Sequence, residues 1–176
     1  AQCAANPNLQ VLDILDDSPV EQYGFIFSKD NTALRDEFND SLQHIMDNGL
    51  YDMIMEYYEE NGYSPETPSF FTTKGTIVVE TSPDFPPYDN MHGQEYTGID
   101  MDIMRAIGYV TGYNIEFRQN TFDSIIVSVQ QGKCDLGASG FTIDDDRKQR
   151  VDFSTPYAEI HQVLVVKEGS NICLLY

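Results

Sequence analysis

One stretch of the chain combines the residue types that bind a carboxylate. Gly140-Phe141-Thr142 is followed by an acidic run and then by Arg147. A guanidinium presents two parallel donors that fit a carboxylate bidentately, which makes Arg147 the candidate carboxylate partner. Gly140 would let a ligand approach the main chain, and Thr142 can offer its amide and hydroxyl to the same group.

The same stretch also has an ordinary structural interpretation. Asp144, Asp145 and Asp146 precede Arg147, so Arg147 could decorate a solvated helix face with local ion pairs. A short helix starting near Asp144 would add unpaired amides and a dipole that favours an anion. It could also be a plain strand-to-helix turn, and on the residues alone the structural interpretation of Arg147 is the stronger one.

Other chemistry finds little support in the residue pattern. The cysteines Cys3, Cys134 and Cys173 form no C-x-x-C pair, and the three histidines lie far apart without ligand spacing. We expect Cys134 to be a small apolar residue in a buried strand. No Ser-His-Asp or Cys-His arrangement stands out, and no D-x-D-x-D-G calcium loop is present. We therefore expect no catalytic residues, no metal and no cofactor.

Composition and charge limit the class of protein. A chain of 176 residues, 41% hydrophobic and 22% charged, is typical of one packed domain. The 29 acidic against 10 basic residues give a net charge of −19, which disfavours nucleic acid and anionic membranes as partners and fits solubility outside the cell or adaptation to salt. No run approaches the roughly 20 apolar residues of a membrane span, and no secretory signal opens the chain, so we expect a mature or trimmed sequence.

The spacing of apolar residues predicts alternating strands and helices. From an N-cap at Asn31 or Thr32, apolar residues recur with helical spacing up to Asn48-Gly49, and a shorter aromatic helix follows through Tyr58. Other helices are expected at 99–110 and 122–131, and strands at 9–15, 23–27, 76–80, 114–117, 134–138 and 161–167. Crossover units of this kind predict an α/β fold with a mainly parallel sheet covered by helices on both faces.

Residues 61–74 interrupt this pattern and read as a linker. Asn-Gly, Ser-Pro and Thr-Pro pairs occur there without periodicity, as in a long surface connection. The linker separates two segments, 20–60 and 75–168, whose apolar faces are too large to leave in water. We expect both segments to share one sheet, with Leu34, Phe38, Leu42 and Ile45 packed against it.

From Gly75 to Gly169 the chain resembles the first lobe of the type-3, amino-acid-binding family of extracellular solute-binding proteins. Seven motifs occur in the family's order and at matching separations. They are Thr76-Ile77-Val78-Val79-Glu80, Phe85-Pro86-Pro87-Tyr88, Gly98-Ile99-Asp100-Met101-Asp102-Ile103, Phe122-Asp123-Ser124-Ile125-Ile126, Gly132-Lys133-Cys134-Asp135, Gly140-Phe141-Thr142-Ile143-Asp144-Asp145-Asp146-Arg147 and Val151-Asp152-Phe153-Ser154-Thr155-Pro156-Tyr157. The resemblance implies a type II periplasmic-binding-protein-like α/β lobe.

Residues 23–58 are similar to a different part of that family, the carboxyl-terminal segment that returns to the first lobe. This implies a single lobe over 1–176 with its segments in permuted order, made of 20–60 and 75–168 and joined by the linker. Residues 1–19 and 169–176 would be connectors to an absent second lobe. The Pro-rich linker favours a piece of a tandem array over a deliberate permutation.

The resemblance also implies a binding site. Arg147, Thr142 and Gly140 would hold the ligand's carboxylate, with the Arg147 guanidinium pointing toward the Thr142 amide across a surface cleft. Four further positions match places where the family contacts ligand. They are Phe85 and Phe122 for its aliphatic part, Ser82 for its side chain or ammonium group, and Tyr88 for the pocket wall. Generic aromatic residues are usually core, and for Phe122 the core interpretation stays open.

The implied function is non-catalytic binding of a polar amino acid or close analogue, as the substrate-binding component of an ABC importer outside the cytoplasm of a bacterium. Its partners would be a membrane permease and a second lobe from an adjacent segment or another chain. Two alternatives remain: a ligand-sensing ectodomain of a membrane receptor, and a dehydratase on the same fold. Specificity depends on both lobes of such proteins and is not readable from this sequence.

Overall fold

The computed structural model describes residues 8–12, 20–61 and 74–169. The chain forms two compact units, of which the larger comprises Gln22–Ala158 and the smaller comprises Ala1–Glu21 with Glu159–Tyr176. Most of the predicted linker, Cys3, Cys173 and the outer parts of the predicted connectors lie outside the described residues. The assignment of the segments to a permuted lobe stays a prediction.

The larger unit is built on a five-stranded sheet with the order β10-β3-β9-β4-β8. These strands are β10 (Asp152–Phe153), β3 (Ile26–Phe27), β9 (Leu136–Gly137), β4 (Gly75–Thr81) and β8 (Tyr113–Gln119). β4 pairs in parallel with β8 and β9, whereas β3 pairs antiparallel with β9 and β10. A strand from before the predicted linker therefore lies between two strands from after it.

The α/β class is confirmed, and the sheet is mixed. The parallel pairs belong to crossover units, in which a helix returns the chain to the same end of the sheet. β3 is not part of such a unit, because it reaches the sheet from a distant part of the sequence and runs against its neighbours. The predicted 23–27 strand is divided at Gly24-Phe25 into β2 (Val20–Tyr23) and β3.

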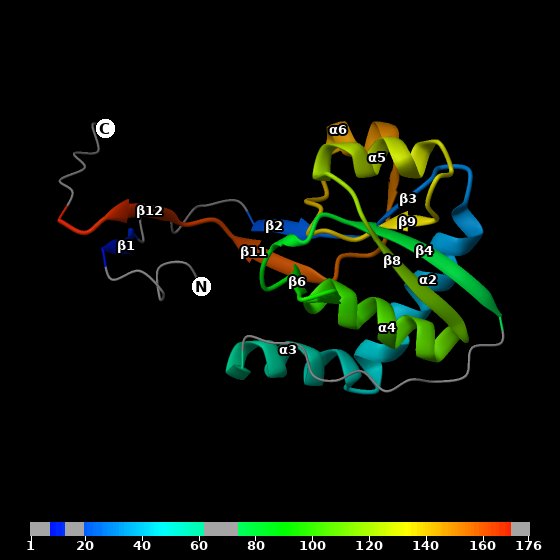
Figure 1. Cartoon of the computed structure of the whole chain (residues 1–176), viewed down its shortest axis with the longest axis horizontal. Helices are drawn as coiled ribbons and strands as arrows, with labels where there is room; N and C mark the ends of the chain where they lie inside the picture. The colour runs from blue at the N-terminus through cyan, green and yellow to red at the C-terminus, as the bar shows by residue number, and fades with distance from the viewer. Residues whose placement is uncertain (1–7, 13–19, 62–73, 170–176) are drawn as a thin grey trace. The chain divides into compact units, whose positions relative to one another are not determined.

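Helices cover both faces of this sheet (Figure 1). α5 (Phe122–Gln130) packs on β3, β4 and β9, while α4 (Ile99–Thr111) packs on β8. α2 (Thr32–Asp47) contacts β3, β10 and α4, and α3 (Leu50–Asn61) packs on α2 and α4. In Figure 1, α5 and the short α6 (Asp145–Arg150) lie on one side of the sheet, and α2, α3 and α4 lie on the other.

The helical prediction around residues 32–48 is confirmed, because α2 buries one stripe of its surface. Leu34, Phe38, Leu42 and Ile45 are all buried at intervals of three or four residues. The Phe38 ring meets Phe27 of β3 edge-on, with 5.7 Å between ring centroids. The helix therefore docks on the same sheet that the later segment builds.

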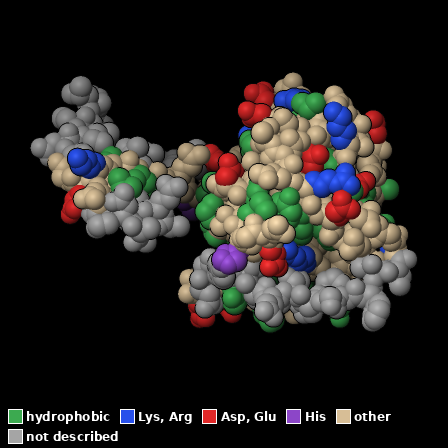
Figure 2. Space-filling view, viewed as in Figure 1, with side chains coloured by type: hydrophobic (Ala, Val, Ile, Leu, Met, Phe, Trp, Pro, Cys, Tyr) green, Lys and Arg blue, Asp and Glu red, His purple; other side chains and the backbone are tan. Residues whose placement is uncertain are grey.

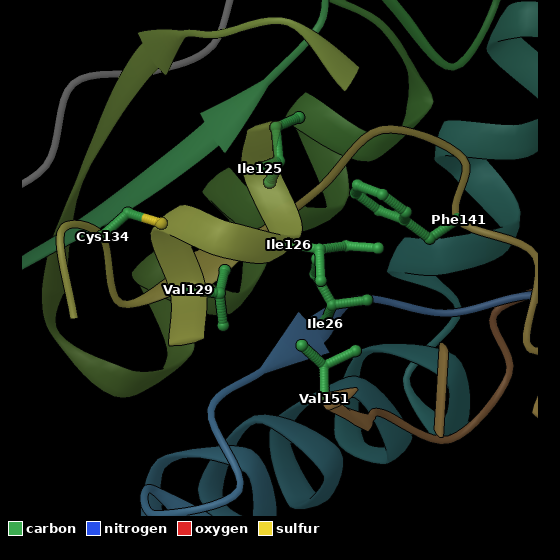
Figure 3. Close-up of a cluster of buried hydrophobic side chains, with 7 residues drawn as sticks. All are labelled: Ile26, Ile125, Ile126, Val129, Cys134, Phe141 and Val151. Carbon is green, nitrogen blue, oxygen red and sulfur yellow. The ribbon is translucent and has the colours of Figure 1, made fainter. Parts of the chain in front are cut away.

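A second apolar cluster lies on the opposite face, under α5 (Figure 3). Three of its side chains come from α5, and the rest come from the sheet and the loops around it. The members are Ile26, Ile125, Ile126, Val129, Cys134, Phe141 and Val151. Cys134 is a small buried core residue as predicted, and burial raises the pKa of its thiol to about 12, but it lies before β9 (Leu136–Gly137) and not in a strand. Ile26 belongs to the segment before the predicted linker, and the other members of this cluster belong to the segment after it. The two segments therefore share this core.

A small three-stranded sheet, β5-β6-β7, was not predicted. It consists of β5 (Asp84–Phe85), β6 (Asp89–His92) and β7 (Glu95–Thr97), and it leads into α4 through Gly98. Gly98 has a φ of 134°, and a Cβ there would lie 2.2 Å from the carbonyl oxygen of Tyr88. Only glycine fits, so the backbone of the Tyr88 turn rests directly on the start of α4.

The smaller unit contains antiparallel strands. β1 (Leu9–Leu12) pairs with β12 (Leu164–Lys167), with Leu9 opposite Lys167. A separate two-stranded sheet consists of β2 and β11 (Ala158–His161), and each of these two strands has residues in both units. The predicted strands at 9–15 and 161–167 are thus found in shorter form, although residues 13–15 lie outside the described part of the chain.

The surface of the larger unit reflects the acidic composition. In Figure 2, Asp and Glu side chains are spread over the visible face, with fewer Lys and Arg between them and an apolar patch among them. Isolated pairs on such a surface contribute little to stability, because solvent and salt screen them. The buried acidic residues described below differ from this surface population.

Candidate functional site

Arg147 lies against the backbone that the sequence predicted. Its Nη1 donates a hydrogen bond to the carbonyl oxygen of Thr142 at 2.9 Å and forms an ion pair with Asp144 at 3.0 Å. The guanidinium also sits over the rings of Phe122 and Phe141, at 5.6 and 6.0 Å from their centroids. The Arg147 guanidinium therefore binds the carbonyl oxygen of Thr142 directly. The sequence predicted instead that it faces the Thr142 amide across a surface cleft.

The rest of the Arg147 guanidinium is available. Within the described part of the chain, Nη1 makes one hydrogen bond and an ion pair, and Nε and Nη2 make no hydrogen bond. Nε and Nη2 form one of the two edges that bind a carboxylate bidentately. The side chain is 27% exposed, so a ligand can reach this edge while the guanidinium face lies over the two rings.

The expected anion site at the start of α6 is already filled by the protein. The Asp144 side chain accepts a hydrogen bond from the Arg147 amide at 2.7 Å and so acts as the N-cap of this short helix. The carboxylate that benefits from the helix terminus is therefore that of Asp144. Both interpretations of this stretch are partly realised, since Arg147 has a local ion pair and an open edge.

Gly140 is covered by an aromatic ring rather than open to solvent. It has a φ of 56°, and a Cβ at this position would lie 2.9 Å from Cε1 of Phe85. Phe85 is 43% exposed and stacks on Tyr88, with 5.7 Å between their centroids. Tyr23 contacts both rings and also forms a β-bridge with Thr142. Tyr23 thus links the predicted aromatic wall to the predicted carboxylate subsite.

Phe122 has both roles that the sequence left open. Its ring stacks on Phe141 with 4.6 Å between centroids, and it packs against the cluster under α5. It is also half-buried and lies beneath the Arg147 guanidinium. Phe122 is therefore part of the core and supports the candidate carboxylate partner.

Ser82 is buried next to the carboxylate of Asp89. The Ser82 amide donates to Ser139 Oγ at 3.2 Å, and Ser139 Oγ in turn donates to Asp89. Asp89 also accepts hydrogen bonds from Thr81 Oγ1 at 3.1 Å and from the Phe85 amide at 3.0 Å. Burial raises the pKa of Asp89 to about 6, although its hydrogen bonds oppose this shift. Asp89 thus fixes the loop that carries Ser82 and Phe85.

A second buried carboxylate, Asp100, holds the neighbouring residue. Its Oδ2 accepts a hydrogen bond from the Gly140 amide at 2.8 Å, and its Oδ1 accepts one from the Tyr157 hydroxyl at 2.6 Å. Burial raises the pKa of Asp100 to about 7. Asp89 and Asp100 therefore act on the consecutive residues Ser139 and Gly140 from two different elements, β6 and α4.

A surface hollow of about 410 Å³ lies elsewhere on this unit. Arg35, Lys148 and Asp152 are among its lining residues, and none of the predicted site residues is. Arg35 is already bound to Asp36 and Asp152, each at 2.6 Å. The hollow therefore offers no open guanidinium, although Ile143 and Lys148, which line it, are the sequence neighbours of Thr142 and Arg147.

The sequence of the region that holds these features matches a known family. Residues 77–173 match the bacterial extracellular solute-binding proteins, family 3. This match covers more than half of the chain and includes the predicted site residues, from Ser82 to Arg147. The chain belongs to this family. As a family 3 protein, it places its candidate site beyond the carboxyl ends of the parallel strands β4, β8 and β9, with Arg147 on α6.

Curated relatives within the family are similar over the same region. A probable histidine-binding protein of Neisseria gonorrhoeae is 37% identical over 53% of this chain and 35% of its own length. The arginine-binding extracellular protein ArtP of Bacillus subtilis is 32% identical over 56% of this chain and 39% of its own length. Among solved structures, an ancestral arginine-binding protein bound to arginine is 40% identical over 48% of this chain and 38% of that one, with a TM-score of 0.47. The chain thus spans well under half the length of these relatives.

Two findings concern the described residues of this family member as a whole. They contain no helix that is both long and apolar enough to cross a membrane. They also contain no group of three or more His, Cys, Asp or Glu side chains arranged to hold a metal ion.

Sequence reasoning missed several residues that shape the site. Asp89, Asp100 and Tyr157 lie within or beside the family motifs, and Ser139 and Tyr23 lie in or next to predicted strands, but the sequence indicated no site role for any of them. Asp100 lies in the first turn of α4, where acidic residues are common on helix surfaces, so no local pattern indicated its burial. The partners of Asp100 could not be predicted, since Gly140 and Tyr157 lie 40 and 57 residues away in the sequence.

Proposed function

We propose that this chain binds a polar amino acid or a close analogue through the ligand's carboxylate, without catalysing a reaction on it. The observation that carries the proposal is the open edge of Arg147. Nε and Nη2 remain available while Nη1 is fixed by Thr142 and Asp144. A free amino acid presents a planar carboxylate that fits such an edge.

The aromatic side chains next to this edge suit the rest of an amino acid. Phe85 and Tyr88 form a stacked, partly exposed pair, and Phe122 supports the guanidinium from below. Faces of this kind bind the aliphatic or cationic part of a side chain. The proposed site is completed by Ser82, Thr142 and Gly140. Ser82 and Gly140 contribute mainly through their backbone positions, which hydrogen bonds to Ser139 and Asp100 hold in place.

The buried acids support binding over catalysis. A dehydratase on this fold would need an acidic residue that reaches the substrate. Asp89 and Asp100 are both 0% exposed, and their oxygens already accept hydrogen bonds from the protein. The relatives named above are binding proteins by name, and we extend that role to this chain as a proposal.

The proposed setting follows from the family. We place the chain outside the bacterial cytoplasm, as the substrate-binding component of an ABC importer with a membrane permease as its partner. A second lobe from an adjacent segment or another chain would complete the site and contact the ammonium group. A sensor ectodomain would use the same site, and a receptor span in the same polypeptide would identify it.

A comparison of L-arginine with agmatine, which lacks the carboxylate, tests the proposal. Both ligands carry a guanidinium, so they differ at the group that Arg147 is proposed to hold. We expect arginine to bind about ten-fold more tightly, because a charge-assisted pair contributes about 1.5 kcal/mol or more. Titrations followed by ¹H–¹⁵N NMR should show the largest shifts at Gly140–Ile143 and at Arg147 Nε. Equal affinity for the two ligands would contradict a carboxylate subsite.

A further inference from the structure

Asp100 is enclosed by the protein although it lies beside the candidate site. Its side chain is 0% exposed, and its two oxygens accept from the Gly140 amide and the Tyr157 hydroxyl. It therefore cannot contact a ligand. Its geometry instead joins two segments that are far apart in the sequence.

One end of this connection is the ligand-facing turn. Gly140 adopts a φ of 56° and lies under the Phe85 ring, two residues before Thr142. Asp100 binds the Gly140 amide, and this hydrogen bond sets the direction of the backbone that leads to Thr142. Thr142 in turn accepts the hydrogen bond that orients Arg147. A shift of the turn would therefore move the guanidinium as well.

The other end is Tyr157, near the last residue of the larger unit. The Tyr157 amide donates to the carbonyl of Tyr23 at 3.0 Å, and its ring stacks on Phe25 with 4.4 Å between centroids. The Tyr51 hydroxyl donates to the Tyr157 carbonyl. Asp100 thus ties the turn to the residues at which the chain enters and leaves this unit.

A carboxylate is a costly choice for a purely structural contact at this position. The titratable groups that face Asp100 are Tyr51 of α3, Tyr88 of the β5–β6 turn, Asp89 of β6 and Tyr157, and all of them are acids. Burial raises the pKa of Asp100 to about 7, so the fold bears the cost of holding an anion there at higher pH. Such a cost is common where a group serves a functional site.

We propose that Asp100 is a positioning residue for amino-acid binding, which fixes the Gly140 turn and Arg147 through hydrogen bonds to its two carboxylate oxygens. The inference rests on the proposed function of the site. Ionised Asp100 accepts both hydrogen bonds at full strength, whereas the protonated acid is a weaker acceptor for the Gly140 amide. The firmness with which the Gly140 turn and Arg147 are held, and with it the affinity for the ligand, therefore depends on the charge of Asp100.

Two substitutions separate this role from a structural one. Asp100→Leu keeps a similar volume and removes both acceptors, and we expect the dissociation constant for L-arginine to rise about five-fold. This variant leaves the buried Gly140 amide and Tyr157 hydroxyl without acceptors, so its urea midpoint should also fall, and its affinity is measured under conditions in which circular dichroism shows it to be folded. Asp100→Asn keeps one acceptor for Gly140 and remains neutral at every pH.

The pH profile of arginine binding, measured by NMR titration between pH 6.5 and 8, provides the decisive comparison. Arginine keeps its guanidinium and carboxylate charges over this range. Ionisation of Asp100 should make the unmodified chain bind about three-fold more tightly at pH 8 than at pH 6.5, and Asp100→Asn should leave only the smaller dependence that Asp89 contributes near pH 6.5. This arm decides the question even where Asp100→Leu fails to fold.

The outcomes distinguish the inference from the function on which it rests. If the unmodified chain binds arginine and Asp100→Asn keeps the same pH profile, Asp100 does not position the site. Unchanged affinity in a folded Asp100→Leu variant would overturn the inference in the same way. If the unmodified chain binds neither arginine nor any other common amino acid, the proposed function fails, and the inference fails with it.

Discussion

Replacing Phe38 with alanine should lower the free energy of unfolding of the larger unit by about 3–5 kcal/mol, the usual cost of removing a fully buried aromatic ring. Phe38 is 1% exposed and packs on Phe27 of β3. The loss should appear as a lower urea midpoint in circular dichroism and tyrosine fluorescence. Tyrosine is the suitable probe because the chain has 11 Tyr and no Trp.

The distribution of this loss tests whether the early and late segments fold together. β3 lies between β9 and β10, so cavity formation under α2 should weaken the whole sheet. Amide exchange should therefore accelerate in β4 and α5 as well as in α2. Met53→Ala, at a position that is 67% exposed on α3, is the matched control and should change stability by less than about 0.5 kcal/mol. Unchanged protection in β4 and α5 of the Phe38 variant would mean two independent folding units.

Replacing Arg147 with alanine should weaken binding of L-arginine by about thirty-fold. The charge-assisted pair with the ligand's carboxylate would be lost, and such pairs contribute about 1.5–3 kcal/mol. The preference for arginine over agmatine should disappear in this variant, because Arg147 is the group that distinguishes them. Titration followed by NMR measures both effects in one series.

Two further variants sharpen the interpretation of the Arg147 result. Arg147→Lys keeps the charge but has no planar fork, so it should recover only part of the affinity. Lys148→Ala removes a neighbouring cation that is 54% exposed and paired with Asp145, and it should leave binding unchanged. A similar loss in the Lys148 variant would indicate general attraction of an anion to α6 instead of a defined subsite.

The sequence predicted those parts of the fold that local patterns determine. Leu34, Phe38, Leu42 and Ile45 repeat with helical spacing, and α2 begins at Thr32 and buries all four. The strands β5, β6 and β7 were missed because they have two to four residues and no alternating pattern. The direction of β3 was also outside the reach of local patterns, since it depends on neighbours more than a hundred residues later.

In the candidate site, too, the sequence predicted some features and could not predict others. The family motifs located Arg147 beside Thr142, and the structure brings them into contact. They could not reveal that Asp144 occupies part of the guanidinium, or that Phe85 covers Gly140. The roles of Asp89 and Asp100 were hidden because acidic residues in a chain of net charge −19 are expected on the surface. Their burial follows from tertiary contacts alone.

Calorimetric titration of this chain with the common amino acids tests the central claim most directly. The proposed site offers one carboxylate subsite and a few aromatic faces, and the ligand's ammonium group would stay in water. We therefore expect millimolar or weaker binding, about −4 kcal/mol or less in magnitude, which a second lobe would strengthen by excluding solvent. Micromolar binding by the isolated monomer would show that the chain already holds a complete site, and would contradict this account of a single binding lobe.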